Sequence, residues 1–141
     1  MTYTRRNEYK KLEMAEVTIS GTPSAGGYLT LTLVDDSFSS AMTGSGTSTL
    51  TLPAGYYFPR AACTVTRSTA DDNFAFDLEV DGTVGGRPGQ TGNYLNSRAD
   101  YAEYPFKLTS SGQLRLKVSA VESTAPTITS NSKLWIWRTP L

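Results

Sequence analysis

Two acidic runs, Asp35-Asp36 and Asp71-Asp72-Asn73, contain the side chains of this sequence that could most readily hold a metal ion. Their oxygens are ligands of the kind that Ca²⁺ prefers, and this ion takes about six to eight of them. Neither run has the spacing of a known calcium loop, and both lie at the ends of predicted strands, where acidic residues form solvated turns. We therefore expect no metal site here, with calcium at Asp71 and Asp72 as the alternative.

The sequence contains no histidine, and Cys63 is its single cysteine. The lack of histidine removes the side chain most often used as a general base and as a transition-metal ligand. One cysteine can form neither an internal disulfide nor a thiolate metal site. Because Ala61 and Val65 share its side of a predicted strand, Cys63 is expected to be a buried small residue rather than a reactive thiol.

Patterns typical of nucleotide-binding enzymes are also missing from the sequence. Neither GxxxxGK[ST] nor GxGxxG occurs, and the glycines Gly85, Gly86 and Gly89 lie in a predicted loop with no helix after it. We therefore expect a protein without enzymatic activity and without a cofactor. A small jelly-roll hydrolase, with two carboxylates converging from separate loops, is the alternative that the sequence leaves open.

The charge of the chain is balanced, with 13 lysines and arginines against 13 aspartates and glutamates. Such a chain has no field of one sign to attract nucleic acid or anionic lipid, so neither is expected as a partner. The first residues, MTYTRRNEYKK, are not followed by an apolar run, and neither a signal peptide nor a membrane span is predicted. The protein is expected to mature in a cytoplasm, or to leave the cell by lysis.

Alternation of apolar and polar residues is the main structural signal, and it indicates half-buried strands. In YLTLTLV, residues 28–34, the leucines share one side and the threonines the other, and FAFDLEV at 74–80 has the same pattern. Asp81-Gly82 then predicts a tight hairpin turn, and Pro105 favours an edge strand or a bulge. The predicted strands are 16–20, 28–34, 47–52, 55–68, 74–80, 103–109, 113–121 and 133–138, with longer loops at 35–46, 85–101 and 123–132.

Strands with one apolar face each need a second layer to cover that face. The sequence therefore predicts one all-β domain over residues 16–141, folded as an eight-stranded antiparallel jelly-roll sandwich. The side chains expected to share one core are those of Phe74, Phe76, Leu78, Val80, Leu114, Leu116 and Val118.

Residues 1–15 are polar and of mixed charge, and they are predicted to form a short N-terminal arm before the sandwich. The basic residues of this arm are Arg5, Arg6, Lys10 and Lys11. Two interpretations stay open, a solvated tail and an arm that docks on a neighbouring subunit. As a docking arm, it would use these four cations for contact.

Large rings gather at two places where one core cannot bury them all. In KLWIWR, Trp135 and Trp137 must face away from Leu134 and Ile136, because side chains alternate along a strand. One pair fills the core, and the other needs a cover, either a neighbouring subunit or the loop 85–101. By the same alternation, at least one ring of the run 56–58 must point outward. The predicted subunit interface therefore consists of Tyr56, Tyr57, Phe58, Trp135 and Trp137, with a ring packed under its own domain's loop as the alternative.

Three segments in this order, LPAGYYFPRAACTVT, FAFDLEVDG and KLWIWRTPL, resemble the complement C1q and tumour-necrosis-factor superfamily of trimeric jelly rolls. The resemblance covers residues 50–82 and, less closely, 130–141. It implies a homotrimer in which rings near the start of the strand at 55–68 line the threefold axis or close the end of the sandwich.

A jelly roll without histidine or a secretion signal, and with a short polar arm, is also similar to virion components of tailed phages. This similarity implies a homotrimeric capsid decoration (cement) protein that stabilises the head of a phage particle assembled in the host cytoplasm. Its other partner would be the major capsid protein or another virion protein. The alternative is a receptor- or glycan-binding knob of a phage fibre or collar. In such a knob the loops 35–46 and 85–101 would make the contacts, with Arg87, Tyr94 and Arg98.

Overall fold

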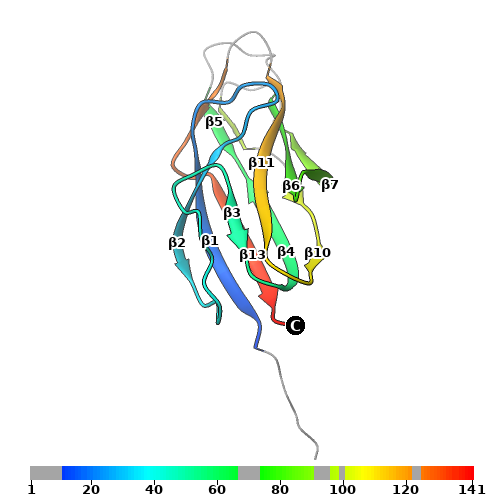
Figure 1. Cartoon of the computed structure of the whole chain (residues 1–141). Helices are drawn as coiled ribbons and strands as arrows, with labels where there is room; N and C mark the ends of the chain where they lie inside the picture. The colour runs from blue at the N-terminus through cyan, green and yellow to red at the C-terminus, as the bar shows by residue number, and fades with distance from the viewer. Residues whose placement is uncertain (1–10, 67–73, 91–95, 99–100, 122–124) are drawn as a thin grey trace, which may run out of the picture.

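The chain folds as a β-sandwich. The computed structural model describes residues 11–66, 74–90, 96–98, 101–121 and 125–141, and within these ranges it contains strands and no helix. The strands form two packed layers (Figure 1). This architecture confirms the predicted all-β jelly-roll sandwich.

Several predicted strands are divided, so that the described ranges contain thirteen strands rather than eight. The predicted strand 55–68 is interrupted at Cys63, and the predicted strand 103–109 is interrupted at Tyr104 and Pro105. The strands are β1 (Glu13–Ser20), β2 (Thr30–Asp36), β3 (Leu50–Leu52), β4 (Gly55–Ala62), β5 (Thr64–Thr66), β6 (Phe74–Val80), β7 (Thr83–Gln90), β8 (Asn96–Arg98), β9 (Ala102–Glu103), β10 (Phe106–Leu108), β11 (Gly112–Val121), β12 (Thr127–Ile128) and β13 (Lys133–Thr139).

The prediction of a single loop over 85–101 is wrong, because β7 extends into it as far as Gln90 and β8 lies within it. β12 likewise lies in the predicted loop 123–132. The sequence of β7, TVGGRPGQ, has no alternation, so its strand character comes from pairing with β6. Its glycines mark close packing: a Cβ atom at Gly89 would lie 2.2 Å from the Phe76 ring, and one at Gly85 would lie 2.5 Å from the Tyr104 ring.

The predicted N-terminal arm is too long, since β1 begins at Glu13 instead of after residue 15. Met14 pairs with Trp137 and Ala15 pairs with Ile136 on β13, and Ala15 is buried. The sequence did not indicate the start of this strand because Glu13, a charged residue, occupies an inward-facing position. Its buried partner is described below. The arm before residue 11 lies outside the described residues.

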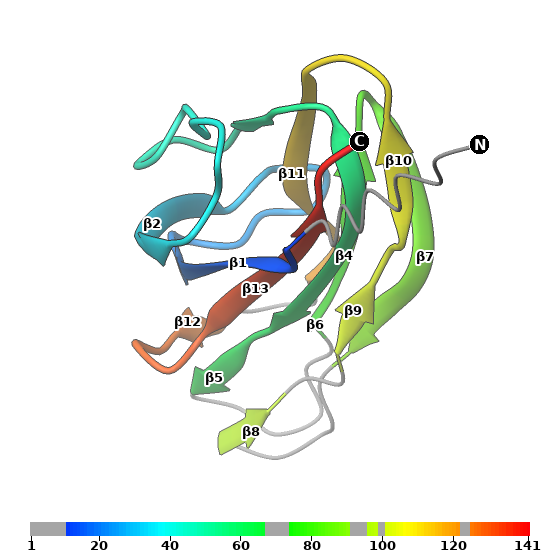
Figure 2. The same ribbon diagram turned by 90° about the horizontal axis from the view of Figure 1, so that it is seen from below.

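The two layers are continuous through β7. One layer contains β2, β1, β13 and β4, with β9 and β10 both paired to β4, and the other contains β3, β11, β6 and β7. β7 pairs with β6 and also with β9, so the sandwich is closed along that side (Figure 2). A small three-stranded sheet, β12-β5-β8, continues one end. The C-terminus and the start of β1 lie at the opposite end (Figure 1).

The hydrophobic core lies between these layers and confirms the predicted set. All seven predicted core side chains, Phe74, Phe76, Leu78, Val80, Leu114, Leu116 and Val118, are buried in one cluster. Cys63 is buried with them, and its burial raises the pKa of the thiol far above its usual value. The predicted Asp81-Gly82 hairpin is present, with φ angles of 49° and 83° at its two central residues.

Candidate subunit interface

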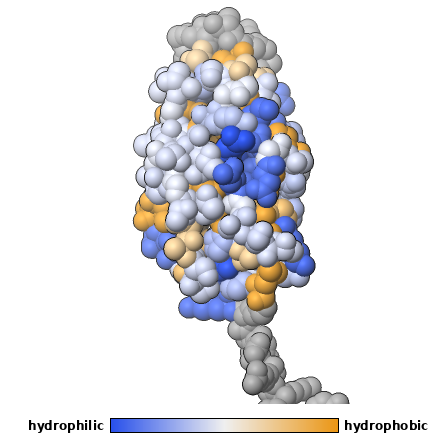
Figure 3. All heavy atoms as spheres, viewed as in Figure 1, coloured by the Kyte–Doolittle hydropathy of each residue, from blue (hydrophilic) through white to orange (hydrophobic). Residues whose placement is uncertain are grey.

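The outer faces of the two layers differ in chemistry. On β6 and β11, charged side chains pair across the strands, with Arg115 opposite Glu79 and Lys117 opposite Asp77. Arg115 Nη2 lies 2.7 Å from Glu79 Oε1, and Figure 3 shows strongly hydrophilic residues on the side of the molecule that β11 faces. The charged side chains of this outer face pair with one another, so the face can lie in solvent without a partner chain.

The outer face of β1, β13 and β4 carries large apolar side chains instead, and we call it the aromatic face. Its central row is Met14, Trp137 and Phe58, which are paired neighbours on the three strands. Met14 is 44% exposed and Phe58 is 41% exposed. Tyr56 and Leu12, at the end where the arm begins, are exposed still further. The aromatic face therefore presents a contiguous apolar surface to solvent.

Alternation along β13 decides which rings reach this surface. Leu134 and Ile136 are fully buried in the core, and Trp135 and Trp137 lie half-buried on the opposite side. This confirms that the two pairs face opposite ways. The alternative cover, the predicted loop 85–101, includes residues outside the described ranges; at its last position, Tyr101 places its ring 6.4 Å from that of Trp135.

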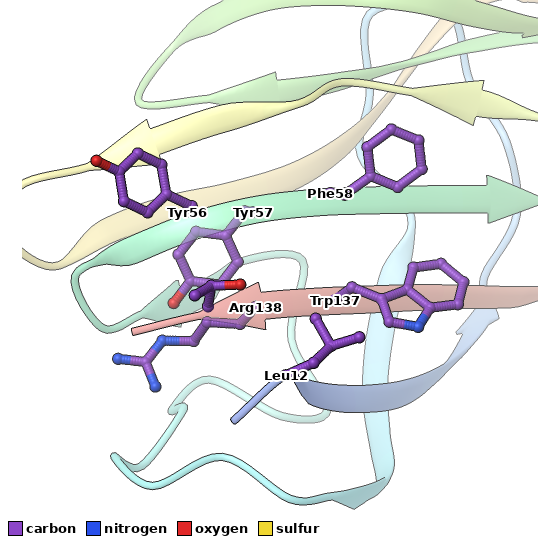
Figure 4. Close-up of a pocket in the computed structure, with 7 residues that line it drawn as sticks. Leu12, Tyr56, Tyr57, Phe58, Trp137 and Arg138 are labelled. Carbon is purple, nitrogen blue, oxygen red and sulfur yellow. The ribbon is translucent and has the colours of Figure 1, made fainter. Parts of the chain in front are cut away.

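Two open hollows interrupt the aromatic face. The first, of about 170 Å³, is lined by Leu12, Tyr56, Tyr57, Phe58, Trp137, Arg138 and Thr139. Figure 4 shows the Tyr56 and Phe58 side chains projecting from β4 and the Trp137 indole from β13, with Leu12 beside the indole.

The second hollow, which we call the Trp135 hollow, has a volume of about 300 Å³. It is lined by Met14, Arg60, Tyr101, Trp135 and Trp137. The Arg60 guanidinium carbon lies 3.7 Å from the centre of the Tyr101 ring, so the cation stacks on the face of this ring. The hollow therefore has apolar walls and one charged group.

The prediction that Tyr57 belongs to the subunit interface is wrong, because its ring points inward and the residue is only 3% exposed. It stacks on Phe106 with a centroid separation of 5.1 Å, and its hydroxyl donates a hydrogen bond of 2.5 Å to the Pro53 carbonyl. Burial raises the pKa of Tyr57 to about 12. Tyr56 and Phe58 on either side of it point outward, as the alternation requires.

A buried ion pair, which the sequence did not suggest, closes the end of the sandwich beneath the aromatic face. Arg138 and Glu13 are each 4% exposed, and Arg138 Nη1 donates to Glu13 Oε2 over 2.5 Å. Arg138 Nη2 also donates to the Ala54 carbonyl over 2.7 Å, and the Ser39 N–H donates to Glu13 Oε1 over 2.8 Å. The pair thus ties the first strand, the last strand and the loop before β4 together.

The remaining predicted contact residues do not form one group. Of the arm cations, Lys11 is exposed, while Arg5, Arg6 and Lys10 lie outside the described residues. Arg87 lies on β7, in register with Glu103, and the backbone of Arg98 pairs with Thr64 on the separate small sheet. Tyr94 lies outside the described residues. Arg87 and Arg98 therefore belong to different sheets instead of one contact loop.

The acidic runs form no metal site in the described part of the chain. Asp35 and Asp36 line a small hollow with Glu16, and Asp36 Oδ1 accepts a hydrogen bond from the Phe38 N–H. Asp71 and Asp72 lie outside the described residues. Among the residues described, no three Asp, Glu, Cys or His side chains are arranged to hold a metal ion. The described ranges also contain no helix that could cross a membrane.

Comparisons with known proteins show the fold. No protein-family model matches this chain, and no curated protein matches it in sequence. Among solved structures, the chain is similar to the crystal structure of murine APRIL at pH 8.5, with a TM-score of 0.65 and 10% sequence identity. The match covers 91% of this chain and 99% of the APRIL chain. It is also similar to the globular domain of zebrafish complement 1qA, with a TM-score of 0.62 and 9% identity over 92% and 96% of the two chains. The chain therefore has a C1q/TNF-like jelly-roll fold.

Proposed function

We propose that this chain is a non-enzymatic structural protein that assembles as a homotrimer and decorates the capsid of a phage. The observation that carries the self-association is the aromatic face, where Met14, Trp137 and Phe58 form one exposed row across three strands. The outer face of the other layer differs, because its charged side chains pair with one another across β6 and β11 and need no partner chain.

The energetic argument rests on the apolar area that this face leaves in water. Burying apolar surface is worth about 25 cal/mol per Å², and an aromatic side chain buries about 150–250 Å² in all. Tyr56 and Phe58 are about half exposed, and the two indoles of β13 are half-buried. Covering these four rings would therefore contribute several kcal/mol per chain, and aromatic residues are enriched in interfaces for this reason.

Three copies and a phage particle are supported by the sequence resemblances. The resemblance to trimeric jelly rolls favours a closed ring of three chains. The similarity to cement proteins favours a capsid surface as the site of attachment. The start of β1, which the arm precedes in the chain, lies at the same end of the sandwich as the C-terminus (Figure 1). An arm there would be free to contact the major capsid protein while the aromatic faces hold the copies together.

The first experiment measures the mass of the isolated protein. Native mass spectrometry and light scattering are expected to give a trimer for the wild type and monomers for Phe58→Ser and Trp137→Ser. Val84→Ser is the matched control, because Val84 is 43% exposed but lies on β7, away from the aromatic face. A wild type that stays monomeric at high micromolar concentration would contradict the proposal.

The second experiment locates the protein in a purified particle. Hundreds of copies on the head would support decoration, whereas a few dozen at a fibre or collar would support the receptor-binding knob. Deleting residues 1–11 leaves β1 and the Glu13–Arg138 pair in place. This variant is expected to stay trimeric and to lose its binding to the head. If the truncated trimer still binds fully, the arm is not the docking element.

A further inference from the structure

The Trp135 hollow is large enough to receive a ring from another molecule. Its volume is about 300 Å³, and a cavity of about 150 Å³ in an unrelated protein holds a benzene molecule. Its walls are two indoles, one phenol ring and the Met14 side chain. A flat apolar group would therefore find contact on several sides.

Arg60 adds a polar requirement to this hollow. Its Nε lies 3.0 Å from Glu103 Oε1, but the direction of that contact does not form a hydrogen bond. No described residue accepts a hydrogen bond from its terminal Nη atoms. A group that completes the hollow should therefore carry an acceptor oxygen at its far end, next to the guanidinium.

One exposed side chain of this protein matches both requirements. The large apolar side chains that are exposed in the described ranges are Leu12, Met14, Val34, Tyr56, Phe58, Val84 and Leu141. Of these, Tyr56 alone joins an aromatic ring to a hydroxyl, and it is 51% exposed. Lys107 Nζ lies 5.2 Å from the centre of its ring and would accompany it.

We infer that the Trp135 hollow binds the Tyr56 ring of a neighbouring copy, with the Tyr56 hydroxyl accepting a hydrogen bond from Arg60. This inference rests on the proposed homotrimer and names the contact that orients its chains. Charge is compatible with the same match: the Lys107 that travels with Tyr56 would come beside Glu103 or Glu16, the two carboxylates that flank Arg60 and Trp135 in the strand register. Within the chain Glu103 lies 3.0 Å from Arg60 and Glu16 lies 3.4 Å from Lys133, so either carboxylate would share its charge with Lys107. The hollow is incomplete without the second chain.

The contact cannot form within one chain, and it joins each copy to the next in one direction. Tyr56 and Arg60 are four residues apart on β4, about 13 Å along an extended strand, and Tyr56 lines the other hollow. Each chain thus offers a ring at one place and a hollow at another. Contacts of this heterologous kind join copies head to tail, and they close into a ring of three where the rotation between successive copies is a third of a full turn.

Photochemical cross-linking tests this contact directly. Tyr56 is replaced by p-benzoylphenylalanine, a photoreactive aromatic residue that inserts readily into methionine C–H bonds. Irradiation of the trimer is expected to join position 56 of one chain to Met14 of the next, as identified by peptide mass spectrometry. The same label at Val84 is the control and should give no product between chains. Cross-links from position 56 to position 56 or to Phe58 would overturn the inference.

A double-mutant cycle tests the hydrogen bond to Arg60. Tyr56→Phe and Arg60→Met are each expected to weaken trimer association about tenfold, because a hydrogen bond to a charged group is lost. The double variant should be no weaker than the worse single one, since both remove the same contact. Independent, additive effects would overturn the inference. A monomeric wild type refutes the homotrimer itself, whereas a stable trimer with additive effects refutes only this contact.

Discussion

Replacing Glu13 by Gln is expected to lower the free energy of unfolding by about 3–5 kcal/mol near pH 7, the cost of leaving a buried charge without its partner. Glu13 and Arg138 are each 4% exposed, and the guanidinium would keep only neutral partners such as the Ala54 carbonyl. Urea unfolding, followed by tryptophan fluorescence, measures the change. All variants are compared at one protein concentration, because association of copies adds to the apparent stability.

Glu16 provides the matched control on the same strand. Its carboxylate lies 3.4 Å from Lys133 Nζ, but the two side chains are 37% and 25% exposed. Solvent screens such a pair, so Glu16→Gln is expected to change stability by about 1 kcal/mol or less. The double variant Glu13→Gln/Arg138→Met should be more stable than Glu13→Gln alone, because the unpaired charge is gone.

The pH dependence of the same variants gives an independent check. Burial raises the pKa of Glu13, but the hydrogen bonds from Ser39 and Arg138 outweigh it, and the pKa lies below its ordinary value of 4.5. A carboxyl group with a lowered pKa in the folded state contributes its full stability above the unfolded value, and loses it as the pH falls through the folded value. The difference between wild type and Glu13→Gln should therefore be constant above about pH 5.5, shrink as the pH falls below 4.5 and continue to fall with further acidification. A loss of under about 1 kcal/mol near neutral pH, equal to that of Glu16→Gln, would refute the reasoning.

Three further outcomes are expected. Phe76→Ala should cost about 3–5 kcal/mol in urea unfolding, since the ring is fully buried, and a loss below about 1 kcal/mol would contradict its place in the core. Gly86→Ala should strongly destabilise the protein, because φ at Gly86 is 72° and an added Cβ would lie 1.9 Å from the Glu103 carbonyl oxygen; an unchanged urea midpoint would contradict this close approach of β7 to Glu103. Cys63 should resist a thiol reagent in the native protein and react on unfolding, because it is buried with a raised pKa; rapid native labelling would contradict this.

The core strands could be predicted from the sequence because their signal is local. Along β6 and β11, side chains alternate between core and solvent, and this period of two follows from the extended backbone alone. The Asp81-Gly82 turn needs two residues that tolerate positive φ, and these residue types are visible without a structure. The layered sandwich follows, since each such strand needs a second layer over its apolar face.

β7 and the start of β1 could not be predicted in this way. The glycines of β7 indicate a loop when they are considered alone, and only the Phe76 and Tyr104 rings packed against them explain why a strand requires them. Glu13 suggests a solvated arm until its partner Arg138, 125 positions away in the chain, is placed beside it. In both cases the deciding contact is distant in sequence.

For the aromatic face, the sequence by itself determined that Trp135 and Trp137 lie opposite Leu134 and Ile136, because alternation is a property of one strand. Only the tertiary structure decided that the leucine and isoleucine fill the core, and that Trp137 has Met14 and Phe58 as neighbours. The physical reason is that cross-strand neighbours depend on register. Register is set by packing of the whole sandwich, and no single strand contains that information.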